Sequence, residues 1–185
     1  MTETETEVRR RRSLNTTSRD MILSMAVIVG LILVFLLLVP RPNKIPERTL
    51  DVPAAATAAV TELGFTPAVP TLPEGWTART ADVQRGTDDL PTWHLTYTSP
   101  SGHYVGVQQA AKATAAWEGR QVTDGADQGN ITVGGKTWVI RSRTDRGITS
   151  WVLRETPVTT VVTGTAPESE LAFFATAVAS DLSGT

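Results

Sequence analysis

The chain has 185 residues, with 17 lysines and arginines, 19 aspartates and glutamates, two histidines and no cysteine. This length allows one domain with a tail or an anchor. The absence of cysteine excludes disulfides, thiolate metal sites and a cysteine nucleophile. A charge balance close to neutral gives the chain no electrostatic reason to bind nucleic acid.

Residues 21–39 form an uninterrupted apolar segment, MILSMAVIVGLILVFLLLV, without a charged side chain. A helix of this length reaches about 28 Å, close to the roughly 30 Å of a bilayer's hydrocarbon core. Because lipid offers the backbone no hydrogen-bond partner, we expect a transmembrane helix here, in contact with the bilayer. Ser24 and Gly30 are candidate positions for packing against another membrane helix.

Basic residues are more numerous before this segment than after it. Five arginines precede it, whereas Arg41, Lys44 and Arg48 follow within a similar distance. The positive-inside rule therefore places the N-terminus in the cytoplasm. We expect four parts: a cytoplasmic basic tail (1–20), a transmembrane helix (21–39), a Pro-rich stalk (40–52) and an extracytoplasmic domain (53–185).

A cleaved signal peptide is the alternative interpretation of the apolar segment. Signal peptides usually have a shorter apolar region, which is followed closely by a small-residue cleavage site. Here Pro40 follows directly, and the first run of alanines starts only at Ala54. We therefore favour an uncleaved anchor in the cell membrane. No cysteine follows the segment, which excludes lipoprotein processing.

The first half of the outer domain begins with a predicted helix over 53–63, which has proline at its start and Gly64 at its end. Alternating apolar and polar residues then predict three strands, over 76–85, 92–99 and 103–111. Residues 112–120 follow as a helical turn or short helix, and residues 123–129 as a loop rich in glycine and aspartate.

The second half contains four predicted strands, over 130–133, 136–143, 148–155 and 158–164. Gly134 and Gly135 form the turn of the first hairpin, because glycine adopts positive φ without strain. A final helix starts at Pro167 and Glu168 and carries an apolar stripe. Strands joined by tight turns predict an antiparallel meander of about seven strands covered by helices, an α+β fold.

Several segments together resemble a known family: the basic tail with one anchor, PEGW, WHLTY, GGKTW, VVTGTA and LAFFATAVASDL. In these features the chain is similar to the uncharacterised actinobacterial family "domain of unknown function 4245", over nearly its whole length. The PEGW segment and the terminal helix are also similar to the wider group of Mog1/PsbP-like α/β/α sandwiches. The resemblance implies an exported, membrane-anchored domain and assigns no catalytic residue.

The residues that could carry chemistry form no recognised catalytic or metal-binding motif. No G-x-S-x-G elbow accompanies His94 and His103, and their spacing is not that of a helical metal pair. Asp88 and Asp89 are interpreted as a solvated turn rather than a calcium or glycosidase site. We therefore predict no catalytic, cofactor-binding or metal-binding residue.

Four residues are candidates for contact with a partner or ligand. Trp117 lies in a segment with weak secondary-structure preference, so it is the best candidate for a tryptophan exposed to a partner or ligand. Arg141, Arg143 and Arg154 lie on neighbouring predicted strands, where they could form a basic strip for an acidic partner or lipid head groups. The alternatives are core packing for the tryptophan and ordinary solvated charges for the arginines.

These features favour a non-catalytic, single-pass membrane protein whose outer domain binds a partner. We expect an accessory subunit of an envelope or respiratory membrane complex, with an integral membrane protein as its partner. The alternative is a module that binds a small molecule or lipid in a pocket between sheet and helices. An enzyme is the least favoured hypothesis, because it would need a cleft with clustered titratable groups.

Overall fold

The computed structural model describes residues 21–35, 50–86 and 88–184. The chain divides into two compact units, Met1–Glu47 and Arg48–Thr185. The predicted cytoplasmic tail and most of the predicted stalk lie outside the described residues.

In the first unit, residues 21–35 form an α-helix. Within the described ranges, no helix has both the length and the apolar character needed to cross a membrane. The last part of the predicted span, residues 36–39, lies outside these ranges. The transmembrane helix over 21–39 therefore stays a prediction.

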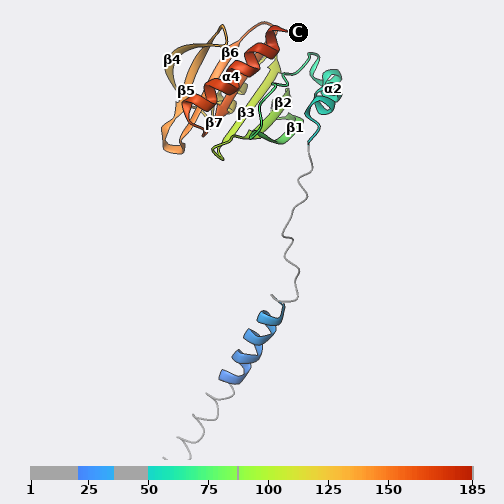
Figure 1. Ribbon diagram of the computed structural model, residues 1–185, viewed down its shortest axis with the longest axis vertical. Coiled ribbons are helices and arrows are strands. Elements are labelled where there is room, and N and C mark those ends of the chain that lie inside the picture. Colours follow the sequence, from blue (N-terminus) through green and yellow to red (C-terminus); the bar gives the residue numbers. More distant parts are fainter. Residues whose placement is uncertain (1–20, 36–49, 87, 185) are drawn as a thin grey trace, which may run out of the picture. The chain divides into compact units, whose positions relative to one another are not determined.

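The second unit is an α+β domain whose elements follow one another as labelled in Figure 1. Their bounds are α2 (Val52–Leu63), β1 (Thr77–Arg85), β2 (Pro91–Thr98), β3 (Tyr104–Ala111), α3 (Ala115–Gln121), β4 (Ala126–Val133), β5 (Lys136–Arg143), a 3₁₀ turn (Thr144–Arg146), β6 (Ile148–Arg154), β7 (Val158–Gly164) and α4 (Glu168–Ser183). The predicted order of helices and strands is confirmed. The predicted loop over 123–129 is wrong in its second half, because β4 already pairs with β5 from Ala126 onward, with a bulge after Asp127.

All seven strands form one antiparallel sheet, in the order β1-β2-β3-β7-β6-β5-β4. The predicted simple meander is therefore wrong. After β3 the chain crosses through α3 to the far edge at β4 and returns strand by strand until β7 pairs with β3, where Val107 lies opposite Val162. Tight turns determine which strands are neighbours within each half, but they carry no information about which strands join the halves.

One face of the sheet is covered by α2 and α4; Figure 1 shows α4 lying in front of the sheet. Trp93, Leu95 and Tyr97 of β2 lie on this face and are buried, as their alternation predicts. The buried stripe of α4 packs in the same core: Leu171, Phe174, Ala175 and Val178. Period two in the strands and period 3.6 in the helix thus bring their apolar sides together.

The opposite face carries α3, which packs with Trp117 and Val122 against Ala110, Val152 and Val161. The domain therefore has three layers, with helices on both faces of the sheet. The resemblance to Mog1/PsbP-like sandwiches stays a prediction.

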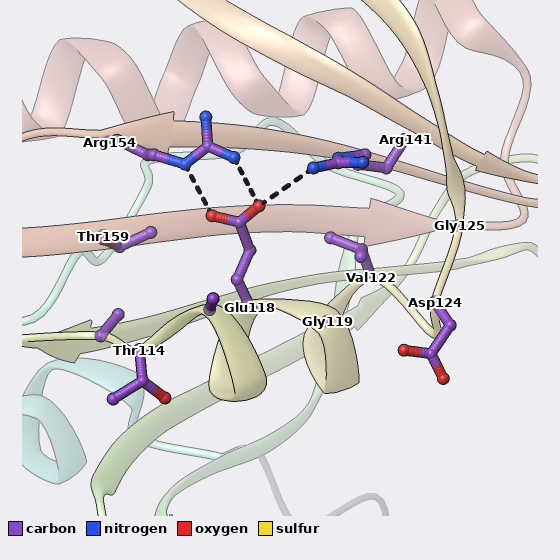
Figure 2. Close-up of a pocket in the computed structure, with 11 residues that line it drawn as sticks. Thr114, Glu118, Gly119, Val122, Asp124, Gly125, Arg141, Arg154 and Thr159 are labelled. Carbon is purple, nitrogen blue, oxygen red and sulfur yellow. Dashed lines mark hydrogen bonds and ion pairs between the residues drawn. The ribbon is translucent and has the colours of Figure 1, made fainter.

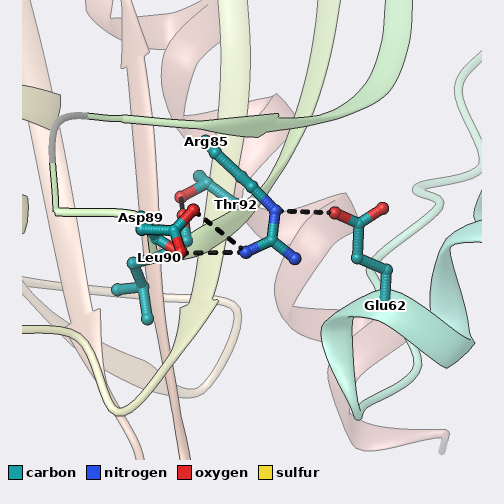
Figure 3. A network of polar contacts seen from close by, with 5 residues as sticks. All are labelled: Glu62, Arg85, Asp89, Leu90 and Thr92. Carbon is teal, nitrogen blue, oxygen red and sulfur yellow. Dashed lines mark hydrogen bonds and ion pairs between the residues drawn. The ribbon is translucent and has the colours of Figure 1, made fainter.

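Local contacts hold α2 against the sheet. The side chain of Asp51 accepts a hydrogen bond from Ala54 N at 3.0 Å and caps the helix, which ends at Gly64 with φ 74°. Arg85, at the end of β1, donates hydrogen bonds to Glu62 of α2 at 3.0 Å and to the carbonyl oxygen of Asp89 at 3.1 Å (Figure 3). Arg85 thus links the helix, the strand and the following turn.

Candidate functional site

A polar pocket of about 490 Å³ opens beside α3, between this helix and strands β5, β6 and β7. Alanine, glycine and threonine residues of α3 and its flanking loops form much of the wall. The charged side chains that line the pocket are Glu118, Asp124, Arg141 and Arg154. Figure 2 shows the first of these acids directed toward the two arginines, and Asp124 apart from them.

Helix α3 is short, and two contacts position it. The hydroxyl of Thr114 caps its N-terminus by accepting a hydrogen bond from Trp117 N at 3.1 Å. The indole of Trp117 is only 1% exposed and donates its Nε1–H to the Thr92 hydroxyl at 2.8 Å. The prediction that Trp117 is an exposed contact residue is therefore wrong: its side chain docks α3 onto the sheet.

Glu118 follows Trp117 in α3, and its side chain is 12% exposed. Its two carboxylate oxygens accept hydrogen bonds from Arg154, at 2.7 Å from Nε and 2.5 Å from Nη2. This bidentate arrangement is the strongest geometry for an arginine–carboxylate pair. The hydrogen bonds from Arg154 to Glu118 raise the pKa of the arginine above its ordinary value.

Arg141 faces the same carboxylate but is held more loosely. Its Nη2 lies 3.6 Å from Glu118 Oε1, and its Nη1 lies 3.9 Å from Asp127 Oδ2. Its Nε is buried and has no hydrogen-bond partner. In the described part of the chain the guanidinium of Arg141 thus has ion pairs but no hydrogen bond, although the side chain is only 27% exposed.

The predicted basic strip is present only in part. Arg141, Arg143 and Arg154 lie on the α3 side of the sheet, as the alternation along β5 and β6 requires. The first and third meet at Glu118. Arg143 instead binds Asp145 at 3.2 Å and the carbonyl oxygen of Thr123 at 2.9 Å, which ties β5 to the loop after α3.

Sequence reasoning missed Glu118, the residue that joins the two pocket arginines. It stands next to a tryptophan in a short helical segment, and nothing in that segment identifies its partner 36 residues along the chain. The pairing depends on the crossover that lays α3 over β5 and β6. A single acidic residue beside the predicted contact residue Trp117 was the only available indication.

A smaller pocket of about 230 Å³ lies on the opposite face, between the start of α4 and strands β4, β5 and β6. Its apolar lining includes the side chains of Ile140, Trp151 and Leu171, and its polar lining includes Ser142 and Thr149. This mixture is typical of a site for a small organic molecule, although the volume lies below the usual range for such sites.

His103 has a serine and a carboxylate nearby, but not in the order of a catalytic triad. The hydroxyl of Ser101 donates to Glu170 Oε2 at 2.6 Å and lies 2.8 Å from His103 Nδ1. A triad needs the histidine between serine and acid, whereas here the serine stands between the other two. The hydrogen bond from Ser101 lowers the pKa of Glu170. The same hydrogen bond ties the β2–β3 turn to α4.

We expect the stability of the outer domain to depend on pH through His94. Partial burial lowers its pKa below 6.5, against a smaller opposing effect of Asp82. The unfolded chain then binds the proton more readily, so the free energy of unfolding falls as pH drops from above 6.5 through the lower folded-state pKa. We expect His94→Gln to flatten this part of the profile, measured by thermal unfolding at several pH values. His103→Gln is the matched control, and an unchanged slope in His94→Gln would contradict the assignment.

The two aspartates that the sequence analysis interpreted as a solvated turn form ion pairs. Asp88 forms an ion pair with Arg120, and Asp89 forms one with Arg85. Within the described ranges, no group of three or more histidine, aspartate or glutamate side chains could hold a metal ion. In the first unit, Ser24 donates its hydroxyl to Met21 O at 2.9 Å, and a side chain at Gly30 would meet nothing within 4 Å. Helix packing through Ser24 and Gly30 stays a prediction.

Comparison with protein-family models finds a match for this chain. A family model described as "Protein of unknown function (DUF4245)" matches residues 13–178, which is most of the chain. A search of curated proteins found no match.

Proposed function

This chain belongs to the DUF4245 family of proteins of unknown function, and we propose that it is a non-catalytic binding protein of the cell membrane. In this proposal residues 21–39 span the bilayer once, residues 1–20 lie in the cytoplasm and residues 53–185 lie outside. The outer domain binds an integral membrane protein and acts as an accessory subunit of an envelope or respiratory complex. The pocket that contains Glu118, Arg141 and Arg154 is its proposed contact site.

The pocket geometry supports binding more than catalysis. Glu118 is held between two guanidinium groups, and the pKa of Arg154 is raised, so this arginine keeps its charge and cannot act as a base. Thr114 and Thr159 line the pocket, but no histidine is among its described lining residues. Fixed charges in a cleft are suited to holding a polar group of a partner.

The first test of this proposal is co-purification. The full chain, tagged at its C-terminus, is extracted from native membranes with a mild detergent, and its partners are identified by mass spectrometry. We expect a stoichiometric partner with the wild type. Arg154→Gln should reduce its recovery about tenfold, the loss expected for one charge-assisted bidentate contact. Replacing Ser24 or Gly30 with leucine should also weaken association if the anchor contributes.

Arg146→Gln is the matched control, since Arg146 is an exposed arginine outside the pocket. Arg146→Gln removes one positive charge, as Arg154→Gln does, but at a position outside the pocket. We therefore expect recovery of the partner to stay unchanged. Recovery of the wild-type protein alone, as a monodisperse species, would contradict the accessory-subunit proposal.

A second candidate function is the binding of a small molecule or lipid. The observation that favours it is the 230 Å³ pocket between α4 and the sheet, with apolar walls and a few polar groups. A wild-type protein that is recovered without protein partners but retains a small molecule, detected by native mass spectrometry, would favour this alternative.

A further inference from the structure

We propose that the pocket beside α3 binds an oxyanion, a carboxylate or a phosphate, through Arg141 and Arg154, with Glu118 as the internal competitor for the same arginines. This inference takes from the proposed function the idea that the domain is a binding module. It does not depend on the identity of a protein partner.

The guanidinium of Arg141 lacks hydrogen-bond acceptors in the described part of the chain. A guanidinium has five N–H donors, and burying them without acceptors is costly. The side chain of Arg141 is 27% exposed, yet its ion-pair distances of 3.6 and 3.9 Å exceed hydrogen-bond length, and its Nε is buried without a partner. Because Nε itself is buried, an oxyanion in the adjoining pocket would bind the Nη groups, for which the described part of the chain provides no acceptor within hydrogen-bond distance.

Arg154 can take part because it is half exposed. Its Nε and Nη2 bind the two oxygens of Glu118, while 49% of its side chain remains accessible. A planar guanidinium matches the two oxygens of a carboxylate or phosphate, as it already does with Glu118. An incoming oxyanion therefore meets two cations and one carboxylate that competes with it.

Space and charge limit the kind of ligand. The pocket of about 490 Å³ is walled by small residues, including Ala113, Ala115, Gly119 and Gly125, which leave room for a ligand beside the arginines. Its two arginines are balanced by Glu118 and Asp124. This balance disfavours polyanions and suits a single carboxylate or phosphate group.

The test is titration of the full chain in a non-ionic detergent with inorganic phosphate and, separately, with acetate. Ionic strength is held constant with chloride. Binding is followed by ¹⁵N NMR at the Arg141 Nε–Hε group and at the Gly119 and Gly125 amides. We expect saturable shifts, and Arg141→Gln should weaken the affinity about tenfold, as expected for one lost charge-assisted contact.

Glu118→Gln separates binding from folding. It removes the competing charge, so it should raise oxyanion affinity about threefold or more even though it removes an ion pair. A residue with only a structural role would not strengthen binding when it is replaced. Arg146→Gln is the control and should leave the affinity within about twofold of the wild type. Arg146 lies outside the pocket, so water and salt screen its charge from the bound oxyanion.

The outcomes distinguish two sources of the oxyanion. If phosphate also releases a co-purified partner, the oxyanion in the complex belongs to that partner; if phosphate binds but releases nothing, the ligand is a free anion. Both results support the inference. It is overturned if neither probe causes shifts that depend on Arg141, or if Glu118→Gln weakens binding. Loss of co-purification alone would contradict the proposed function and leave the oxyanion site standing.

Discussion

Trp117→Ala should lower the free energy of unfolding of the outer domain by about 3–5 kcal/mol, the cost typical of removing a buried tryptophan. The indole is 1% exposed, packs in the cluster under α3 and donates a hydrogen bond to Thr92. Without it, α3 loses its main anchor, and Thr92 loses the donor of a buried hydrogen bond. Urea denaturation of the full chain in non-ionic detergent, followed by far-UV circular dichroism, measures the change.

Trp117→Phe is the matched control. It keeps most of the apolar volume and removes the N–H group, so we expect a smaller loss of about 1–2 kcal/mol. Trp117→Ala should also weaken oxyanion binding, because α3 and its flanking loops form one wall of the pocket. An alanine variant with wild-type stability and an intact pocket would show that α3 does not depend on the tryptophan.

Gly164→Ala should destabilise the domain by about 3 kcal/mol, the upper end of the usual cost of overpacking. A Cβ at this position would lie 2.6 Å from the carbonyl oxygen of Tyr104 and 3.3 Å from the Cα of Val105. Both neighbouring atoms belong to the backbone of β3, so they cannot move aside without opening the β3–β7 pairing. The same carbonyl oxygen accepts a hydrogen bond from Thr165 N at 3.0 Å, which would also be strained.

Gly119→Ala is the comparison for Gly164→Ala. At Gly119 a Cβ would meet only a side-chain oxygen of Asp124, at 3.3 Å, and the residue lies in α3. Alanine favours the helix by up to about 1 kcal/mol over glycine. Thermal unfolding of both variants should therefore give opposite shifts. A Gly164→Ala variant as stable as the wild type would mean that β3 and β7 can separate locally at low cost.

The substitutions at Trp117 and Gly164 test the connection between the halves of the sheet. Strands β1 to β3 and strands β4 to β7 are each built from neighbours in the sequence. Among the described residues, strand pairing joins the two halves only between β3 and β7. Helix α3 is the crossover between the halves and supplies one wall of the pocket. The proposed binding site therefore depends on the same long-range contacts as the fold.

Much of the secondary structure was predictable, because the relevant preferences are local. Alternation along β2 buries Trp93, Leu95 and Tyr97 together, since successive side chains of a strand point to opposite faces. The 3.6-residue period likewise identifies the buried side of α4. Glycine turns and proline at a helix start act over a few residues, so they are visible without knowledge of the rest of the chain.

The candidate site was predictable only in part. Arg141 and Arg154 could be assigned to neighbouring strands, and they do line one pocket. Trp117 was a candidate for an exposed contact residue, but its side chain is buried. A helix as short as Ala115–Gln121 has too few turns for its apolar face to be recognised in the sequence. Glu118 was missed because its partners are far away in the sequence.

The amino-acid order alone thus determines the elements, the turns between neighbouring strands and the apolar character of residues 21–39, since each depends on contacts within a few residues or on composition. The joining of β3 to β7, the direction of Trp117 and the meeting of Glu118 with Arg141 and Arg154 were decided by tertiary packing. Those contacts join segments that are distant in the chain, and their free energy depends on which surfaces are buried together.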